Sequence, residues 1–244
     1  MSNFNFSWVD GNRAGVFPWL MGTYTFKLTI NSEHFGSDSD YVTIFVTNPA
    51  HLMLDYGVAD GVYSSTFDRI VLLSSDAAEL HFINPHDFSD NSLALPYPGN
   101  CVAVNPAGTR VYVANPNSSS VSVIDTATNT VVATVPVGND PLGVAVNPAG
   151  TRVYVANRSS NNVSVIDTAT DMVVATVAVG SNPSGVAVNP AGTRVYVANQ
   201  SSNNVSVIDT ATDTVTATVA VGALPAAFGL FIGPAPTSLD QAGI

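Results

Sequence analysis

Residues 143–157 read GVAVNPAGTRVYVAN, and almost the same stretch begins at residue 101 and again at residue 185. The Asn-Pro pair at its centre falls at Asn105, Asn147 and Asn189, a spacing of 42 residues. Segments 143–180 and 185–222 differ at three positions only. A fixed period of this size indicates one supersecondary unit per copy, stacked on its neighbours to bury a shared core.

Each copy contains four short runs rich in Val, Ile, Thr and Tyr, separated by clusters of turn-forming residues. In the copy that begins at residue 143 the runs are 143–147, 152–156, 162–167 and 172–179. Such residues favour strands, and no window shows a helical period of 3.6 residues. Residues 153–156 are apolar in both alternating positions, so both faces of the sheet are expected to be buried. This pattern predicts an all-β protein, a β-propeller built from four-stranded blades.

The repeat resembles the YVTN-type β-propeller repeat of bacterial and archaeal surface and secreted proteins. The resemblance rests on the segment YVAN at residues 112–115, 154–157 and 196–199, and on SVIDTAT at 122–128, 164–170 and 206–212. It covers roughly residues 98–234 and implies a location at the cell surface or outside the cell.

We divide the chain into three parts. Residues 50–234 form the propeller, with blades at about 56–98, 99–140, 141–182 and 183–222 and a closing strand at 226–234. The first blade is a divergent copy. About four blades plus one strand allow either a small closed ring or an open arc. An open arc leaves a blade edge free for self-association.

Residues 1–49 carry two alternating runs, 22–30 and 41–47, that resemble the last hairpin of a PKD-like or other Ig-like module. They are expected to be part of such a module or to supply strands of a hybrid blade, and 235–244 is a C-terminal tail.

Composition limits the function. The formal net charge is −11, from 18 acidic and 7 basic residues, which argues against binding nucleic acid or an anionic membrane surface. No apolar run is long enough to span a membrane. The single cysteine, Cys101, excludes an intramolecular disulfide, and its strand context favours a buried apolar role.

The chemistry expected of an enzyme is sparse. The inner strands at 102–104, 144–146 and 186–188 carry no acid, His or Lys. The candidates for catalysis lie in the divergent blade: Asp60, Asp68, His81 and His86. The acidic turns at Asp125, Asp167 and Asp209 are expected to be capped by their own carboxylates and to lie beside Arg110, Arg152 and Arg194. No catalytic residue, metal site or cofactor is assigned.

The opposite rim carries loops rich in Asn and Ser, which suit hydrogen bonding to a glycan or a protein. The candidate binding residues are Asn115, Asn117, Asn139, Asp140, Asn157, Asn161, Asn182, Asn199 and Asn203. The leading hypothesis is a non-enzymatic surface or secreted scaffold and binding module. A lactonase-like or other hydrolytic propeller that uses the divergent blade, and a fragment of a larger propeller, are the alternatives.

Overall fold

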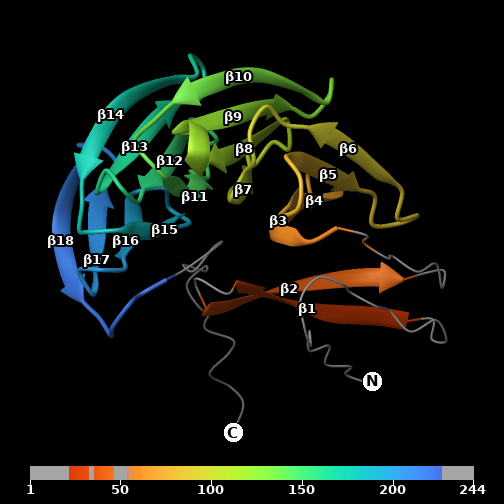
Figure 1. The fold of residues 1–244 in the computed structure, drawn as a ribbon, viewed down its shortest axis with the longest axis horizontal. Coiled ribbons are helices and arrows are strands. Elements are labelled where there is room, and N and C mark those ends of the chain that lie inside the picture. The colour runs from red at the N-terminus through yellow and green to blue at the C-terminus, as the bar shows by residue number, and fades with distance from the viewer. Residues whose placement is uncertain (1–21, 33–35, 47–53, 55, 227–244) are drawn as a thin grey trace, which may run out of the picture.

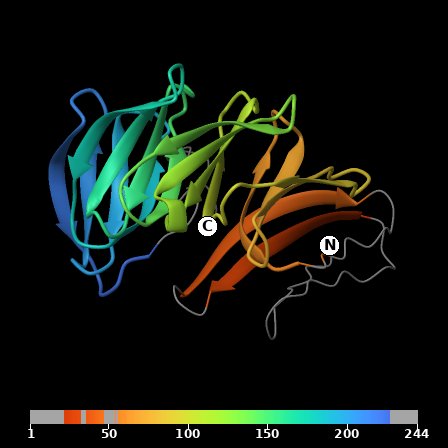
Figure 2. The same ribbon diagram turned by 45° about the horizontal axis from the view of Figure 1, so that its top comes forward.

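The structure of the protein is a computed structural model that describes residues 22–32, 36–46, 54 and 56–226. It contains four four-stranded antiparallel sheets, in each of which the strands follow the order of the chain. Figures 1 and 2 show the sheets side by side as the blades of an arc. The predicted all-β propeller of four-stranded blades is thereby confirmed.

The blades have these strands. Blade 1 contains β3 (Val58–Ser64), β4 (Arg69–Ser74), β5 (Glu79–Ile83) and β6 (Asp90–Ala94). Blade 2 contains β7 (Cys101–Val104), β8 (Arg110–Asn115), β9 (Ser120–Asp125) and β10 (Thr130–Pro136), with the short 3-10 helix η1 (Pro116–Ser118) between β8 and β9. Blade 3 contains β11 (Pro141–Val146), β12 (Arg152–Asn157), β13 (Asn162–Asp167) and β14 (Met172–Ala178). Blade 4 contains β15 (Pro183–Val188), β16 (Arg194–Asn199), β17 (Asn204–Asp209) and β18 (Thr214–Ala220).

The N-terminal strands β1 (Gly22–Ser32) and β2 (Gly36–Val46) pair with each other in a separate two-stranded sheet. This hairpin lies across the open side of the arc and approaches β3 (Figure 1). The inner strands β3, β7, β11 and β15 lie next to one another in that order. The closing strand expected at 226–234 lies outside the described residues, except for its first residue. Among the described residues, no helix is long and apolar enough to cross a membrane.

The turn between the first and second strands of a blade explains why the copies share the same sequence at this point. In blade 3, Asn147 Oδ1 accepts hydrogen bonds from the backbone N–H groups of Thr151 at 2.8 Å and Arg152 at 3.0 Å. Gly150 has φ of +70°, a left-handed conformation that glycine adopts without steric cost. The Asn-Pro-Ala-Gly-Thr sequence therefore fixes where β12 begins.

The turn between the third and fourth strand uses an aspartate. Asp167 Oδ1 accepts from the backbone N–H groups of Ala169 and Thr170, at 3.0 and 3.2 Å. Asp171 closes this turn at φ of 51°, which Asp and Asn tolerate better than most residues. Equivalent bonds involve Asp125 and Asp209, so the predicted capping role of the three aspartates is confirmed.

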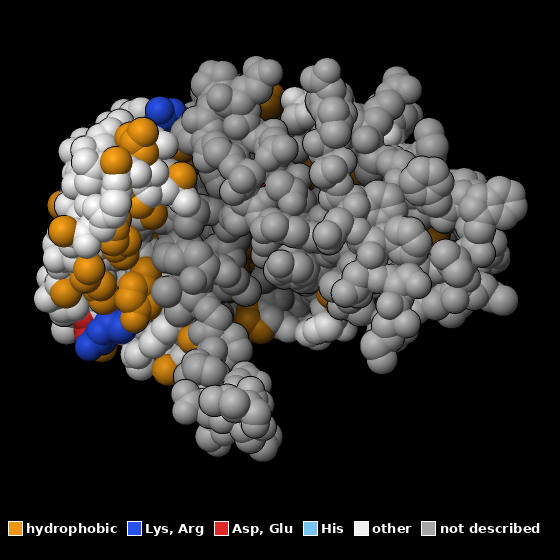
Figure 3. Space-filling model, turned by 90° about the horizontal axis from the view of Figure 1, so that it is seen from below, with side chains coloured by type: hydrophobic (Ala, Val, Ile, Leu, Met, Phe, Trp, Pro, Cys, Tyr) orange, Lys and Arg blue, Asp and Glu red, His pale blue; other side chains and the backbone are white. Residues whose placement is uncertain are grey.

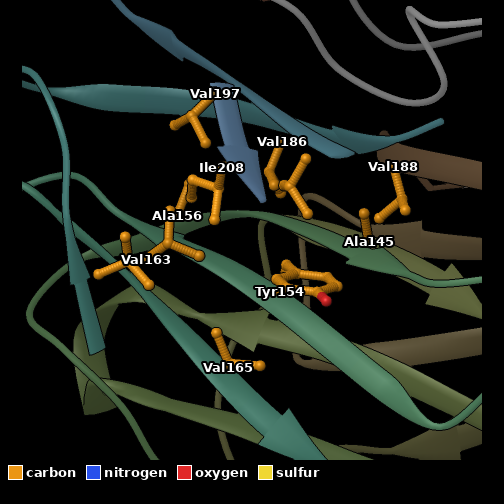
Figure 4. Packing of buried hydrophobic residues seen from close by; sticks show 11 residues of the cluster. Ala145, Tyr154, Ala156, Val163, Val165, Val186, Val188, Val197 and Ile208 are labelled. Atoms are coloured by element: carbon orange, nitrogen blue, oxygen red, sulfur yellow. The ribbon is translucent and has the colours of Figure 1, made fainter. Parts of the chain in front are cut away.

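The core lies between blades rather than within one sheet. In blade 3, Tyr154, Ala156, Val163 and Val165 face blade 4 and pack against its buried apolar side chains (Figure 4). On its other face Val153, Val155 and Ile166 pack against blade 2. Both faces of the sheet are buried, as expected from strands that are apolar in both alternating positions.

Candidate functional site

The polar rim is where the loop that leaves one blade meets a loop of the next. Between blades 2 and 3, the Asn139 backbone N–H donates to Ser160 Oγ at 2.8 Å, and Ser159 Oγ donates to Asp140 Oδ2 at 3.1 Å. Backbone bonds run from Arg158 N–H to Asp140 O and from Ser159 N–H to Asn139 O, at 2.9 and 3.2 Å. These bonds hold the two loops in one fixed shape.

The same arrangement recurs between blades 3 and 4. Asn182 Nδ2 donates to Ser201 Oγ at 2.7 Å, and the Ser181 backbone N–H donates to Ser202 Oγ at 2.6 Å. The Asn182 backbone N–H also donates to Asn161 Oδ1 at 2.9 Å. Successive blade junctions therefore present hydrogen-bonded loops of similar geometry, repeated at the 42-residue spacing of the sequence.

The candidate binding residues fall into two groups. Asn117, Asn139, Asn161 and Asn203 are exposed on the rim, and Asp140 and Asn182 are half-buried there. Asn115, Asn157 and Asn199 are completely buried. These three residues cannot contact a partner because they are buried. The prediction that they are binding residues of the rim is therefore wrong.

The three buried asparagines have a structural role that sequence reasoning missed. Asn157 Nδ2 donates to Ser164 Oγ at 2.9 Å and to Asn162 Oδ1 at 2.8 Å, which ties the end of β12 to β13. Asn115 and Asn199 make the equivalent bonds in their blades. In all three the carbonyl oxygen Oδ1 is buried without a hydrogen-bond donor. The sequence does carry a sign of this role. Each of the three asparagines is followed seven residues later by a serine, which lies on the same face of the sheet as the asparagine.

The inner strand of blade 1 carries one buried acid, Asp60. Its Oδ2 accepts from the Val102 backbone N–H of blade 2 at 2.8 Å, and its Oδ1 accepts from the Gly61 backbone N–H at 2.9 Å. Burial, together with the nearby Asp60 carboxylate, raises the pKa of the Cys101 thiol well above its usual value. Asp60 thus ties two blades together, and Cys101 is held as a buried thiol rather than a reactive thiolate.

His81 and its neighbours form a small cluster at β5 and β6. His81 Nδ1 lies 2.9 Å from Asp90 Oδ2, and the ring stacks on Tyr56 at a centroid separation of 3.8 Å. Nε2 is buried without a hydrogen-bond partner and lies 3.6 Å from Glu79 Oε2. This is an acid–imidazole pair inside the divergent blade.

The other two candidates for catalysis form a separate pair. His86 Nε2 lies 2.8 Å from Asp68 Oδ2, in an exposed turn. The hydrogen bond from His86 is the main reason that the pKa of Asp68 is lowered. His81 and His86 therefore belong to different clusters. Within residues 54 and 56–226 no group of three or more His, Cys, Asp or Glu side chains could hold a metal ion.

The Arg–Asp contacts expected at the opposite rim are present in two of the three close copies. Arg110 pairs with Asp125 at 2.8 Å, and Arg194 pairs with Asp209. Arg152 differs, because its Nη1 is buried without a hydrogen-bond partner. The expectation of a pair in every copy is therefore wrong for blade 3. These half-exposed pairs contribute about 0–1 kcal/mol each, so they do not define the fold.

Comparison with solved structures gives propeller proteins. Hydrazine synthase of Kuenenia stuttgartiensis matches with a TM-score of 0.65 and 25% identity, over 69% of this chain and 50% of that one. A functionally unknown protein from Desulfotomaculum acetoxidans DSM 771 matches with a TM-score of 0.63 and 17% identity, over 81% and 67%. The dihydro-heme d1 dehydrogenase NirN, solved in complex with DHE, matches with a TM-score of 0.59 and 13% identity, over 75% and 43%.

Among curated proteins, the PE-PGRS family protein PE_PGRS18 of Mycobacterium tuberculosis is 56% identical over 43 residues, about one repeat. That match covers 18% of this chain and 9% of the mycobacterial protein, so the chain spans only a small part of this relative and half of hydrazine synthase. The model of the YNCE-like β-propeller family matches residues 49–191, more than half of the chain. The protein belongs to the YNCE-like β-propeller family.

Proposed function

We propose that this protein is a non-enzymatic propeller module that binds a protein or a glycan through its polar rim, at the cell surface or in secreted form. The observation that carries the proposal is the repetition of the rim loops. Junctions 2–3 and 3–4 present exposed Asn and Ser side chains in loops already fixed by hydrogen bonds. A surface that is ordered before binding loses less conformational entropy when a partner docks.

The chemistry of the rim suits a polar, uncharged partner. Exposed asparagine side chains offer one acceptor and two donors each, which match sugar hydroxyls and peptide amides. Equally spaced, similar loops favour a partner that itself repeats. Once one unit of such a partner is bound, the next unit is held near the next loop at a high effective concentration, which raises the overall affinity. Apolar inner strands are a second support, since the residues of β7, β11 and β15 include no acid, His or Lys.

The test is a glycan array followed by titration of the bound glycans. Asn139→Ala and Asn161→Ala should weaken binding about tenfold or more each, equivalent to about 1.4 kcal/mol. Thr134→Ala is the control, because Thr134 is exposed on β10 away from the rim. Binding that both rim variants leave unchanged, or no specific binding to glycans or to an extended polar peptide panel, would refute the proposal.

A competing hypothesis is an enzyme that uses the divergent blade. Two observations favour it: the buried pair of His81 with Asp90, and structural neighbours whose names are those of enzymes. A screen with lactones and esters tests it. Turnover by the wild type that is lost in His81→Ala but kept in His86→Ala would assign catalysis to this pair and displace the binding proposal.

A further inference from the structure

The face of blade 4 that points away from blade 3 is covered in one part and open in another. Near the inner strand β15, Ala198 on β16 is 3% exposed and Tyr196 is half-buried. On the outer strand β18, Val219 is 51% exposed, whereas the equivalent Val177 of blade 3 is 6% exposed. Figure 3 shows apolar side chains gathered at the end of the molecule that blade 4 forms. This face is therefore shielded from water beside its inner strand but not beside its outer strand.

The linker that leaves blade 4 has the geometry of the linker that leads into blade 4. The Leu224 backbone N–H donates to Asn203 Oδ1 at 2.9 Å, as the Asn182 backbone N–H donates to Asn161 Oδ1 one repeat earlier. Leu224 and Asn182 both have φ of 53°. The inner strand β15 begins directly after Asn182. The matching geometry at Leu224 therefore places Pro225 where another inner strand would begin.

A hydrogen bond also joins this continuation of the chain to blade 4. Ser184 Oγ on β15 donates to Pro225 O at 3.4 Å. At junction 2–3, Asn100 Nδ2, directly before β7, donates to Leu142 O of β11 at 3.3 Å. Asn100 and Ser184 occupy the same position of the 42-residue repeat. From this position one inner strand reaches the next at junction 2–3, and β15 reaches the chain's own continuation in the same way.

The residues that follow Pro225 have the sequence of an inner strand. Phe228 and Leu230 stand 42 residues after Val186 and Val188, and both lie beyond the residues that the structure describes. Val186 and Val188 of β15 are each 4% exposed and pack against blade 3 (Figure 4). The pattern that places two apolar side chains against the preceding blade is thus present again one repeat later, with larger side chains.

We propose that residues 226–232 run beside β15 as the inner strand of a fifth blade, so that the chain covers blade 4 with its own C-terminal segment. Phe228 and Leu230 then pack on the face that contains Tyr196 and Ala198. The inner strand of blade 4 packs on the equivalent face of blade 3 in the same way. Removal of these apolar side chains from water supplies the driving force. The contact is made within one chain, so its formation does not depend on protein concentration.

A single inner strand accounts for the division of this face. Such a strand covers side chains of β16 but leaves those of β18, such as Val219, in water. A Cβ added to Gly180 would lie 2.7 Å from Asn199, on the second strand of the next blade. A Cβ added to Gly222 would meet no described atom within 4 Å. Among the described residues, no second strand of a fifth blade therefore lies beside Gly222.

Hydrogen exchange of the full chain, followed by mass spectrometry, tests the proposal. Phe228→Asp places a charge in the contact, so blade 4 should open more often and the amides of β16 should exchange about tenfold faster or more. The amides of β8 in blade 2 serve as the internal reference and should not change. Thr237→Asp is the matched control, because it adds the same charge outside residues 226–232 and should leave β16 as in the wild type.

Leu230→Ala is a milder second variant, which should accelerate the exchange of β16 by a smaller factor. Circular dichroism verifies that each variant is folded, and Leu230→Ala decides the question if Phe228→Asp does not fold. Exchange of β16 that neither variant changes would overturn the proposal, since the segment then does not cover blade 4. Protection of β16 that rises with protein concentration between about 1 and 50 μM would also overturn it, because mass action would then assign the cover to a second copy of the chain.

Discussion

Replacing Asn157 by alanine tests whether the buried amides hold the blades together. The substitution removes two hydrogen bonds, to Ser164 Oγ at 2.9 Å and Asn162 Oδ1 at 2.8 Å. Each is worth about 1 kcal/mol net, and the space left by the amide adds about 1 kcal/mol. Removing the buried Oδ1, which has no donor, returns about 1 kcal/mol. The free energy of unfolding should therefore fall by about 2 kcal/mol.

Urea unfolding followed by far-ultraviolet circular dichroism measures this change, and thermal unfolding gives a second readout. For a protein of this size, 2 kcal/mol corresponds to a fall in Tm of about 4–8 °C. Ser164→Ala and the double variant complete a mutant cycle, in which the coupling between the two side chains should be about 1 kcal/mol. Asn117→Ala is the control, because Asn117 is exposed on the same rim and should change stability by less than about 0.5 kcal/mol.

A loss below about 0.5 kcal/mol for Asn157→Ala would refute this reasoning, because such values belong to surface substitutions. So would a coupling near zero in the cycle with Ser164. Either result would show that the buried amide of Asn157 does not hold the end of β12 to β13.

Gly180→Ala should destabilise the protein by about 1–3 kcal/mol, because its Cβ would lie 2.7 Å from Asn199, whereas Gly222→Ala should be close to neutral; urea unfolding compares them. Cys101, whose raised pKa keeps it a thiol, should not react with a thiol reagent at pH 8 until urea unfolds the chain; rapid native labelling would contradict its burial. The carboxylate of Asp125 accepts hydrogen bonds that lower its pKa in the folded protein. The ionised carboxylate should therefore stabilise the fold fully above a pH of about 3.9, the pKa of an unfolded aspartate. This stabilisation should be lost as the pH falls through the lower pKa of the folded state. Asp125→Asn should therefore narrow the difference in Tm between pH 7 and pH 3, and an unchanged difference would contradict this account.

The fold could be predicted from the sequence because every copy repeats the same turn-forming residues and the same apolar strands. Asn147 and Gly150 fix one turn and Asp167 fixes another, and both turns are encoded by residues next to each other in the chain. Apolar side chains on both faces of each strand then leave stacked sheets as the arrangement that buries them. These local rules predicted the blades without any knowledge of contacts between them.

The site was harder to predict because it depends on register and on neighbouring blades. Asn157 follows a strand and precedes a polar run, so it looked like a loop residue. Only its pairing with Asn162 places the amide over Ser164 and inside the blade. His81 and His86 are close in sequence, yet one lies buried in β5 and the other in an exposed turn. Spacing alone could not separate them.

Blades whose packing faces carry the same apolar side chains can also dock in the wrong order while the chain folds. The face of blade 2 toward blade 3 and the face of blade 3 toward blade 4 are both covered by Val and Ile side chains, which blades 3 and 4 supply alike. Blade 4 can therefore pack on blade 2 with one repeat looped out, and the entropy cost of a longer loop rises only as the logarithm of its length. The native order is favoured because it buries two junctions instead of one, and escape from the skipped arrangement requires a complete blade to detach. The near-identity of the repeats, which makes the fold easy to predict, therefore slows the step in which the blades reach their native order.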